Sequence, residues 1–348
     1  MKKFFRILGI LLASILLIFG SYIAYVYIQY HRIADNQKQL ILSNRETKVS
    51  VNKTYKIMTY NIGYASYPAD YTFFMDGGKE VRARSVKAVD DALDEDVRMI
   101  KSQNPDFVNI QEIDWQGTRS QYVNEPKRLL AEVGGYGSVL TQNYDSAWLQ
   151  YPVLNPIGKA KSGILTLSKY EIDKSTRYSL PIDTNFSKFF DLDRAFDVNV
   201  LPITGSNKKF VLINTHLSAY TKNVAVQKAQ LKKIFAKMQE YVDADDYVIC
   251  GGDYNHDLVG RPKNELTWMK SFPTAELTRG MRVVAPDPQT NVPSVRSNGV
   301  TLTDPKEIFG WIDGFLVSEN VSELSVKSVS NNFKSSDHQP VVMEFQLK

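Results

Sequence analysis

The sequence predicts an α/β protein, and two observations support this fold class. Short apolar runs of strand-like composition alternate with longer stretches whose apolar residues recur at helical spacing, which indicates layered α/β or mixed α+β architecture. The chain has 348 residues, 43% of them apolar and 23% charged, so it is globular and large enough for one big core or two modest ones.

The individual elements can be placed from these patterns. Runs rich in β-branched and aromatic residues are predicted as strands. They are YKIMTYNI (55–62), DFVNIQEI (106–113), GSVLTQ (137–142), SGILTLS (162–168), FDVNVLPI (196–203), KFVLINTHL (209–217), DYVICGGD (246–253), WIDGFLVS (311–318) and PVVMEFQL (340–347). Residues 84–102 and 224–241 are predicted as helices, the second with its apolar or small residues at helical spacing.

The N-terminus carries a separate signal. Residues 7–28 form a run of 22 residues without a charge, long enough at about 1.5 Å per residue to cross a hydrocarbon layer of about 30 Å. A cleaved signal peptide is the alternative, but its apolar region is normally about 7 to 15 residues long and ends at a small-residue site. Cleavage after Ala24 would put Tyr22 at that site. We therefore predict an uncleaved transmembrane anchor.

The charges around this span predict its orientation. The basic residues within residues 1–6 outweigh Arg32 and Lys38 after the span, so the short N-terminus is expected in the cytoplasm and the rest of the chain outside it. The protein would be a single-pass protein of the cell membrane. Residues 29–54 are polar and without a sustained period, and they are predicted as a stalk or linker; residues 55–348 are predicted as the catalytic domain.

Net charge and cysteine content exclude few classes of function. Outside residues 1–28 the chain has 39 basic and 38 acidic residues, so it has no global field that would attract a polyanion, although a local basic patch is compatible with this balance. The single cysteine, Cys250, excludes an intrachain disulfide.

Six short polar motifs occur in order along the chain, each next to a strand-like run. They are MTYNIG with Asn61, NIQEID with Glu112, INTHLSA with His216, GGDYNHD with Asp253 and Asn255, WIDGF with Asp313, and SSDHQP with Asp337 and His338. Strand ends of this kind would deliver the side chains to the rim of one sheet system. Each motif alone has an ordinary explanation as a turn, a cap or a core residue, but six in order indicate a metal-assisted hydrolase.

The residue types fit phosphoester hydrolysis, which needs charge neutralised on the phosphoryl oxygens and a water made nucleophilic. Carboxylates are oxygen ligands suited to Mg²⁺, with Mn²⁺ as a possible substitute. Glu112 is the first expected ligand, with Asn61 and Asp337 completing or supporting the shell. Zinc is not expected, because four histidines and one cysteine form no cluster at zinc spacing.

The remaining motif residues supply acid–base groups. Asp313 is expected to hold the tautomer of His338, which would give a His–Asp base. Asp253 would orient or deprotonate the attacking water. Asn255 offers an amide to a phosphoryl oxygen, and His216 would donate from the other side as electrophile or acid.

An aromatic segment, residues 64–84 (YASYPADYTFFMDGGKEVRAR), follows the first motif and is predicted to overhang the site as a loop. Its aromatic side chains would either grip a base, a sugar or a lipid headgroup or pin the loop to the core. Arg119, Arg194 and Arg296 are candidates for a phosphate contact.

Over residues 55–348 the ordered motifs resemble those of the endonuclease/exonuclease/phosphatase superfamily. The resemblance implies a four-layer α/β sandwich, in which two mixed β-sheets lie face to face with helices outside and a metal site at one end. The resemblance implies that Asn61, Glu112 and Asp337 lie on the metal side of the site. It implies that Asp253 and Asn255 handle the attacking water and the phosphate, and that Asp313 and His338 form an Asp–His pair. His216 resembles the histidine of the nuclease and sphingomyelinase branches. The 51 residues from Asn61 to Glu112 exceed the expected family spacing, and the excess is the aromatic loop.

Together these features predict a membrane-anchored, extracytoplasmic, Mg²⁺-dependent phosphoesterase, a phosphodiesterase rather than a monoesterase. DNA or RNA and a phospholipid headgroup both remain open as substrates, and no protein partner is implied. One alternative is a catalytically silent binding module on the same fold, which would normally have lost one of the motif residues. The other is an inositol-phosphate-type phosphatase, for which a dense basic pocket on the cytoplasmic side would be expected.

Overall fold

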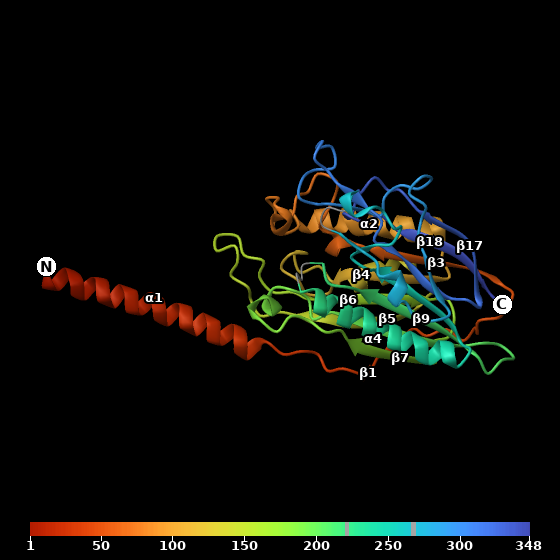
Figure 1. Ribbon diagram of the computed structural model, residues 1–348. Coiled ribbons are helices and arrows are strands. Elements are labelled where there is room, and N and C mark those ends of the chain that lie inside the picture. The colour runs from red at the N-terminus through yellow and green to blue at the C-terminus, as the bar shows by residue number, and fades with distance from the viewer. Residues whose placement is uncertain (220–222, 266–268) are drawn as a thin grey trace.

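The predicted α/β sandwich is confirmed by the computed structural model, which describes residues 1–219, 223–265 and 269–348. In this part of the chain two seven-stranded mixed sheets face each other, and helices cover their outer faces (Figure 1). The two short strand pairs β11 (His256–Asp257) with β12 (Lys270–Ser271) and β14 (Val295–Arg296) with β15 (Phe309–Gly310) lie outside these sheets.

The first sheet has the order β17-β18-β3-β4-β6-β5-β2. Its strands are β17 (Val321–Ser328), β18 (Val341–Leu347), β3 (Thr54–Asn61), β4 (Phe107–Asp114), β6 (Lys161–Ser168), β5 (Gly137–Asp145) and β2 (Ile41–Leu42). β3 and β4 are parallel, and the other neighbours are antiparallel.

The second sheet has the order β1-β7-β8-β9-β10-β16-β13. Its strands are β1 (Gln37–Lys38), β7 (Lys174–Ser179), β8 (Ala195–Pro202), β9 (Lys209–His216), β10 (Tyr247–Asp253), β16 (Asp313–Ser318) and β13 (Met281–Val284). Here β9 and β10 form the parallel pair. Each sheet therefore contributes one pair of parallel strands whose carboxyl ends meet at the same edge.

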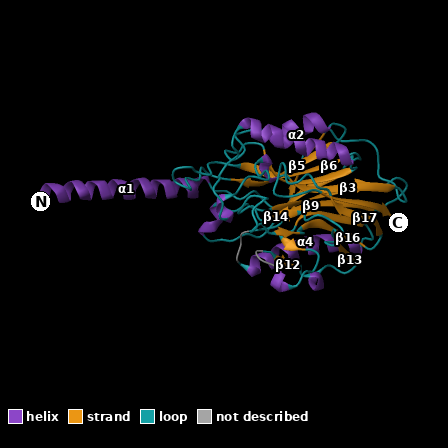
Figure 2. Cartoon of the chain, turned by 90° about the horizontal axis from the view of Figure 1, so that it is seen from above, coloured by secondary structure: helices purple, strands orange, loops and turns teal. Residues whose placement is uncertain are grey.

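Helices α2 (Val86–Gln103) and α3 (Glu125–Val133) pack on the first sheet, and α4 (Val224–Asp243) packs on the second. Figure 2 shows α2 and α4 on opposite sides of the strands. Asn104 ends α2 in the left-handed conformation, which asparagine tolerates at a helix end. The 3₁₀ segments are η1 (Gly63–Ala65), η2 (Phe74–Asp76), η3 (Phe186–Phe189), η4 (Lys263–Glu265) and η5 (Thr274–Glu276).

The interior between the sheets changes from apolar to polar along the strands. At the starts of β3, β4 and β9 the rings of Tyr55, Phe107 and Phe210 pack together in the central core. Further along, amide side chains bridge the sheets: Asn109 donates to the carbonyls of Ile213 and Gly251 at 2.8 and 3.1 Å. The strands thus end in a polar region.

Asn214 is the centre of this bridge. Its Nδ2 donates to the carbonyls of Ile110 and Leu165 at 3.2 and 3.3 Å, and its Oδ1 accepts a hydrogen bond from Gln111 at 2.8 Å. Buried polar groups of this kind are costly unless paired, so the amide network fixes one register of the two sheets.

Helix α1 (Lys2–Gln29) extends away from the sandwich (Figures 1 and 2). Among the described residues it is the one helix that is long and apolar enough to cross a membrane. Its last turns contact the domain, where Val26 is buried with Leu149 and Phe189.

The structure differs from the predicted stalk at residues 29–54. Gln37 pairs with Arg177 as part of β1, and Ile41 pairs with Val139 as part of β2. Val49 is fully buried in the core between the sheets. The backbone of this segment pairs with strands β7 and β5, which would otherwise be open edges of the two sheets. Its strands are too short to leave a periodic pattern in the sequence.

All the strands and both helices predicted in the domain are confirmed, with shifts of a few residues at their ends. The prediction omitted helix α3 and several strands, most notably β7, β13 and β17. β7 has the polar sequence KSTRYS, and β17 is half-exposed, so neither shows an apolar run.

Replacing Asn214 with alanine should lower the free energy of unfolding by about 2 kcal/mol or more, because it leaves buried donors and acceptors on both sheets unpaired. Urea unfolding of the full chain in detergent, followed by tryptophan fluorescence, measures this. The exposed Asn207 is the matched control, and its alanine variant should change stability by less than about 0.5 kcal/mol. Equal effects in the two variants would contradict a structural role for the bridge.

Candidate active site

The backbone pairing of the strands alone brings several motif residues together. Asp253 at the end of β10 lies opposite His216 at the end of parallel β9, and opposite Asp313 at the start of antiparallel β16. On the facing sheet, Asn61 ends β3 beside Gln111 of β4. The predicted gathering at one rim follows from this register.

Glu112 occupies an irregular point of its strand. The pairing of β4 with β6 shifts between Ile110 and Ile113, and Glu112 has a φ of 53°. A positive φ is uncommon for a residue that is not glycine, and bulges of this kind redirect side chains next to active sites. The Glu112 side chain lines the pocket, with 18% of its surface exposed.

Asp253 is the central residue of the site. Its Oδ2 accepts a hydrogen bond from Asn61 Nδ2 at 3.0 Å, and its Oδ1 accepts one from the backbone N–H of Asn255 at 2.8 Å. The Nε2 atoms of His216 and His338 lie 3.6 and 3.8 Å from the same Oδ2. One carboxylate therefore contacts four of the predicted residues.

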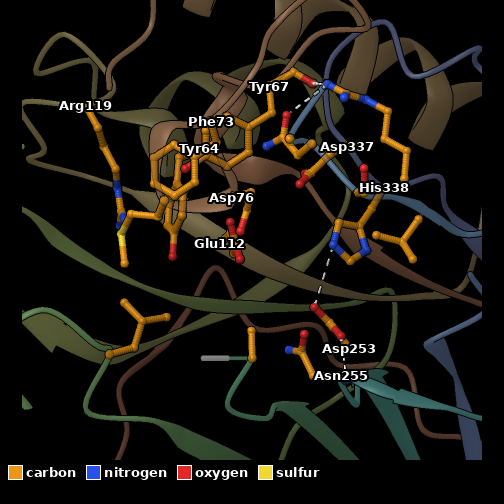
Figure 3. Close-up of a pocket in the computed structure, with 18 of the residues that line it drawn as sticks. Tyr64, Tyr67, Phe73, Asp76, Glu112, Arg119, Asp253, Asn255, Asp337 and His338 are labelled. Atoms are coloured by element: carbon orange, nitrogen blue, oxygen red, sulfur yellow. Dashed lines mark hydrogen bonds and ion pairs between the residues drawn. The ribbon is translucent and has the colours of Figure 1, made fainter. Parts of the chain in front are cut away.

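The side chain of His338 is held by Asp313, which is in turn held by Ser294. Its Nδ1 hydrogen-bonds Asp313 Oδ2 at 2.9 Å, and the hydroxyl of Ser294 donates to the same oxygen at 2.7 Å. The predicted Asp313–His338 pair is thus present, with its Nε2 directed toward Asp253 (Figure 3). Ser294 was not among the predicted residues, because a serine outside any motif carries no signal in a single sequence.

Asp337 approaches from the loop before β18. The hydroxyl of Ser336 donates to the carbonyl of Asn61 at 2.9 Å and lies 3.3 Å from Asp337 Oδ1. A Cβ on Gly63 would come within 3.2 Å of Asp337 Oδ1 and 2.8 Å of the Tyr67 ring, and Gly63 itself has a φ of 55°. The glycine of the MTYNIG motif therefore has no room for a side chain.

The ionisable side chains of the site have shifted pKa values. Burial raises the pKa values of Glu112, Asp253 and Asp337, and the charge of Asp337 raises that of Glu112 further. Burial alone would lower the pKa of His338, but Asp313, together with Asp253 and Asp337, raises it to about 10. The pKa of His216 is instead lowered well below its usual value, first by burial and then by Arg194.

Two sets of residues could hold a cation. Glu112 and Asp337 are pocket-lining carboxylates whose charges oppose each other, as expected for ligands of a hard divalent ion. Asp253, Asp313 and His338 form a second group, with donor atoms within 4.8 Å of one another. In that group the Nδ1 of His338 is already used by Asp313.

A pocket of about 660 Å³ opens in front of these residues. Glu112, His216, Asp253, Asn255, Asp337 and His338 line it, whereas Asn61 and Asp313 lie behind and hold Asp253 and His338. In Figure 3, Asp253 and Asn255 approach from one side, and Tyr64, Tyr67 and Phe73 of the aromatic loop form the other. The overhanging loop predicted from the sequence is therefore part of the pocket wall.

The aromatic loop also has its own packing. The rings of Tyr64, Tyr67 and Tyr71 form a buried cluster with Phe73. Tyr64, Tyr67 and Phe73 of this cluster also line the pocket, whereas Tyr71 does not. Contact of these rings with a base, a sugar or a lipid headgroup remains a prediction.

The three candidate arginines differ in their contacts. Arg296 is buried and donates to loop carbonyls, including Pro68 at 2.8 Å and Tyr71 at 3.1 Å, so it anchors the aromatic loop. Arg119 pairs with Asp114 at 2.9 Å and stacks on Tyr64.

Arg194 is the candidate best placed for an anion. It lines the pocket and is buried, with one contact to Asp191 at 3.0 Å. Within the described part of the chain its Nε and Nη1 atoms have no hydrogen-bond partner, an arrangement that suits a ligand with oxygen acceptors.

Comparison with known proteins identifies the fold and the family. The model of the "Endonuclease/Exonuclease/phosphatase family" matches residues 58–338, while no curated protein matches the chain. The chain has the fold of an endonuclease/exonuclease/phosphatase from Beutenbergia cavernae, with a TM-score of 0.57 and 19% identity over 85% of this chain and 72% of that one.

Two further solved structures share the fold. ANGEL2, a 2′,3′-cyclic phosphatase solved with adenosine-2′,3′-vanadate, has a TM-score of 0.56 and 14% identity over 90% of this chain and 99% of its own. The human Nocturnin catalytic domain has a TM-score of 0.54 and 16% identity over 89% and 97%. At these identities the likeness concerns the fold.

Replacing Arg296 with methionine should loosen the aromatic loop, because the side chain can no longer donate to its carbonyls. Hydrogen–deuterium exchange followed by mass spectrometry should show backbone amides of residues 67–80 exchanging about tenfold faster or more, as expected for the loss of charge-assisted hydrogen bonds. The exposed Arg279 gives the control variant, R279M, for which this segment should be unchanged. Unaltered exchange in R296M would contradict the anchoring role.

Proposed function

This chain belongs to the endonuclease/exonuclease/phosphatase family, whose members hydrolyse phosphoesters with the help of metal ions, and on that premise we propose that it is a Mg²⁺-dependent phosphodiesterase. The observation that carries the proposal is the set of contacts around Asp253, which joins groups from both sheets beside an acidic pocket. A catalytically silent module would not be expected to keep all of these groups in contact.

We assign the metal to Glu112 and Asp337, with Asn61 supporting the shell, and expect Mn²⁺ to substitute for Mg²⁺. A bound divalent cation would supply positive charge to the phosphoryl oxygens and to the leaving oxygen. Burial raises the pKa of both carboxyl groups, and the charge of Asp337 raises that of Glu112 further. This supports the assignment, since a bound cation would favour the ionised form of both groups.

The other side chains have distinct roles in this proposal. Asp253 orients the attacking water and takes its proton, because it faces the pocket and is itself held by Asn61. His338, fixed by Asp313 and surrounded by carboxylates, carries a proton and donates a hydrogen bond to a phosphoryl oxygen. This differs from the His–Asp base predicted from the sequence, and the negative surroundings of His338 are the reason.

Asn255 and His216 complete the phosphate environment. The Asn255 Nδ2 donates to the carbonyl of Leu217 at 2.8 Å, which leaves its second N–H for a phosphoryl oxygen. His216, whose pKa is lowered, would be a neutral donor on the other side. We add Arg194 as a phosphate contact on the strength of its unpartnered nitrogens in the described structure.

We further propose that residues 7–28 anchor the chain in the cell membrane, with residues 1–6 in the cytoplasm and the catalytic domain outside. The length and apolar character of α1 support the anchor, and the basic residues before it support the orientation. The domain then includes residues 55–348, with β1 and β2 from the preceding segment along its edges.

Glu112→Gln, Asp253→Asn and His338→Ala should each reduce hydrolysis by at least about 10², because each removes a charge or proton acceptor needed in the transition state. The assay is full-length protein in detergent with Mg²⁺ or Mn²⁺ against DNA, RNA, phospholipids, inositol phosphates and bis(p-nitrophenyl) phosphate. The exposed Glu319 gives the control E319Q, expected to keep full activity. Activity retained in the three site variants would refute the role assignments, and no product from any substrate would refute the enzyme.

Arg194→Met should lower kcat/KM by about tenfold or more and weaken inhibition by inorganic phosphate, because the pocket loses a charged donor. Steady-state kinetics on bis(p-nitrophenyl) phosphate measure both quantities. Arg279→Met again provides the surface control. Unchanged inhibition by phosphate in R194M would show that Arg194 does not contact the anion.

A further inference from the structure

An apolar surface is exposed beside the pocket, at the loop between β5 and β6. Leu154 is 98% exposed, Val153 70% and Tyr151 55%, and Phe186 in η3 is 46% exposed. Single exposed apolar residues are normal, but a group of large ones marks an interaction surface. We call residues 151–154 and Phe186 the apolar rim.

The apolar rim adjoins the end of α1. The hydroxyl of Tyr22 accepts a hydrogen bond from the backbone N–H of Gln150 at 2.8 Å, and that of Tyr25 accepts one from Trp148 at 3.2 Å. The ring of Tyr30 packs on Phe189 with centroids 5.1 Å apart. Figure 1 shows the β5–β6 loop projecting from the domain toward the side on which α1 lies.

This position corresponds to a membrane surface if α1 spans the bilayer. Tyr22, Tyr25 and Tyr27 lie in the last turns of α1 and Tyr30 follows its end directly. Tyrosine is enriched where a membrane helix reaches the headgroups. The loop that contacts these tyrosines must therefore lie at the same depth. Its fully exposed leucine would then meet lipid rather than water.

A continuous series of aromatic contacts connects the end of α1 to the pocket. The links are Tyr30–Phe189, Phe189–Phe186, Phe186–Phe190, Phe190–Tyr151, Tyr151–Phe74, Phe74–Phe73, Phe73–Tyr67 and Tyr67–Tyr64, with ring centroids between 5.1 and 6.3 Å apart. Phe190, Leu149 and Ile157 line the pocket on this side. The pocket is thus acidic at its base and apolar along the wall that leads to the anchor.

We propose that the apolar rim inserts into the bilayer that α1 spans, and that the pocket takes the phosphodiester of a membrane phospholipid whose acyl chains remain in the bilayer. The substrate part rests on the hydrolase function proposed above. A phospholipid fits both ends of the pocket, because its phosphate reaches the acidic base while its glycerol or sphingoid part lies along the aromatic wall. The nearly neutral domain supplies no comparable attraction for a nucleic acid.

The arrangement also indicates which bond breaks. Figure 3 shows Asp253 on the side of the pocket opposite Tyr67 and Phe73. A water held by Asp253 would therefore attack from that side, and in-line displacement would expel the group on the far side. The water oxygen bonds to phosphorus, and Asp253 takes one proton and passes it to solvent. The P–O bond to the lipid alcohol breaks, and its oxygen takes a proton from solvent. The products are the lipid alcohol and the phosphorylated headgroup.

Insertion can be tested without catalysis. The single native cysteine, Cys250, is buried, so Leu154→Cys in the full chain, reconstituted in phosphatidylcholine vesicles, can be labelled selectively with an environment-sensitive fluorophore. Lipids that carry a spin label near the headgroup should quench this fluorophore by more than half. Leu324→Cys on β17 is the control. Leu324 is half-exposed, and β17 lies at the end of the domain away from α1 in Figure 1, so a label on this cysteine should not be quenched.

Catalysis provides the second readout. The Val153→Glu, Leu154→Glu double variant should hydrolyse phosphatidylcholine in these vesicles at least about tenfold more slowly, yet hydrolyse soluble bis(p-nitrophenyl) phosphate within twofold of the parent protein. Leu324→Glu should alter neither rate. Equal loss on both substrates would mean that the double variant is damaged, and the quenching of the L154C label then decides insertion.

Each negative result of these two experiments overturns a different part of the proposal. An unquenched L154C label overturns insertion, and one that is unquenched but shielded from water indicates a protein partner instead. A quenched label with cleavage of DNA or RNA but not of phosphatidylcholine overturns the substrate assignment and retains the docking surface. If the parent protein does not hydrolyse even the soluble diester, the hydrolase function itself fails, and the substrate assignment fails with it.

Discussion

The hydrogen bond between Asn61 and Asp253 is the constraint on which the site depends, because its two residues end strands of opposite sheets. The amide bridge beneath it, centred on Asn214, holds the sheets in one register. Gly251 adds to this constraint, since a Cβ there would lie 2.9 Å from the Phe315 ring and 3.1 Å from Asn109 Nδ2. A shift of one sheet against the other would separate Glu112 and Asp337 from Asp253 and His216.

The same register explains the electrostatics of the site. Carboxylates from both sheets and from the loop before β18 are buried at one rim, and burial raises the pKa of Glu112, Asp253 and Asp337. Neighbouring charge adds to this effect, since Asp337 raises the pKa of Glu112 and Asp313 raises that of Asp253. Such a cluster is stable as anions only with positive charge nearby. His338 supplies part of that charge and a divalent cation would supply the rest. The acidity of the pocket is therefore a requirement for metal binding as well as for the chemistry.

Much of this arrangement could be predicted from the sequence, because strand ends and the polar residues that follow them are local features. Asn61, Glu112, Asp253 and His338 were all placed at one rim on that basis. Three features could not be predicted. Ser294 holds Asp313 through a contact across distant parts of the chain, the bulge at Glu112 depends on its pairing with β6, and residues 29–54 pack as sheet edges through backbone hydrogen bonds that leave no side-chain pattern.

The position of the cation tests the central claim most directly. Two groups of acidic residues could hold a cation, and the proposed chemistry requires it at Glu112 and Asp337. The measurement is anomalous diffraction at the manganese edge from crystals of the full chain soaked with Mn²⁺. We expect a peak about 2.0 to 2.3 Å from a carboxylate oxygen of Glu112, with Asp337 in or next to the coordination shell. A peak held instead by Asp253, Asp313 and His338, or no peak at this rim, would contradict the proposed site.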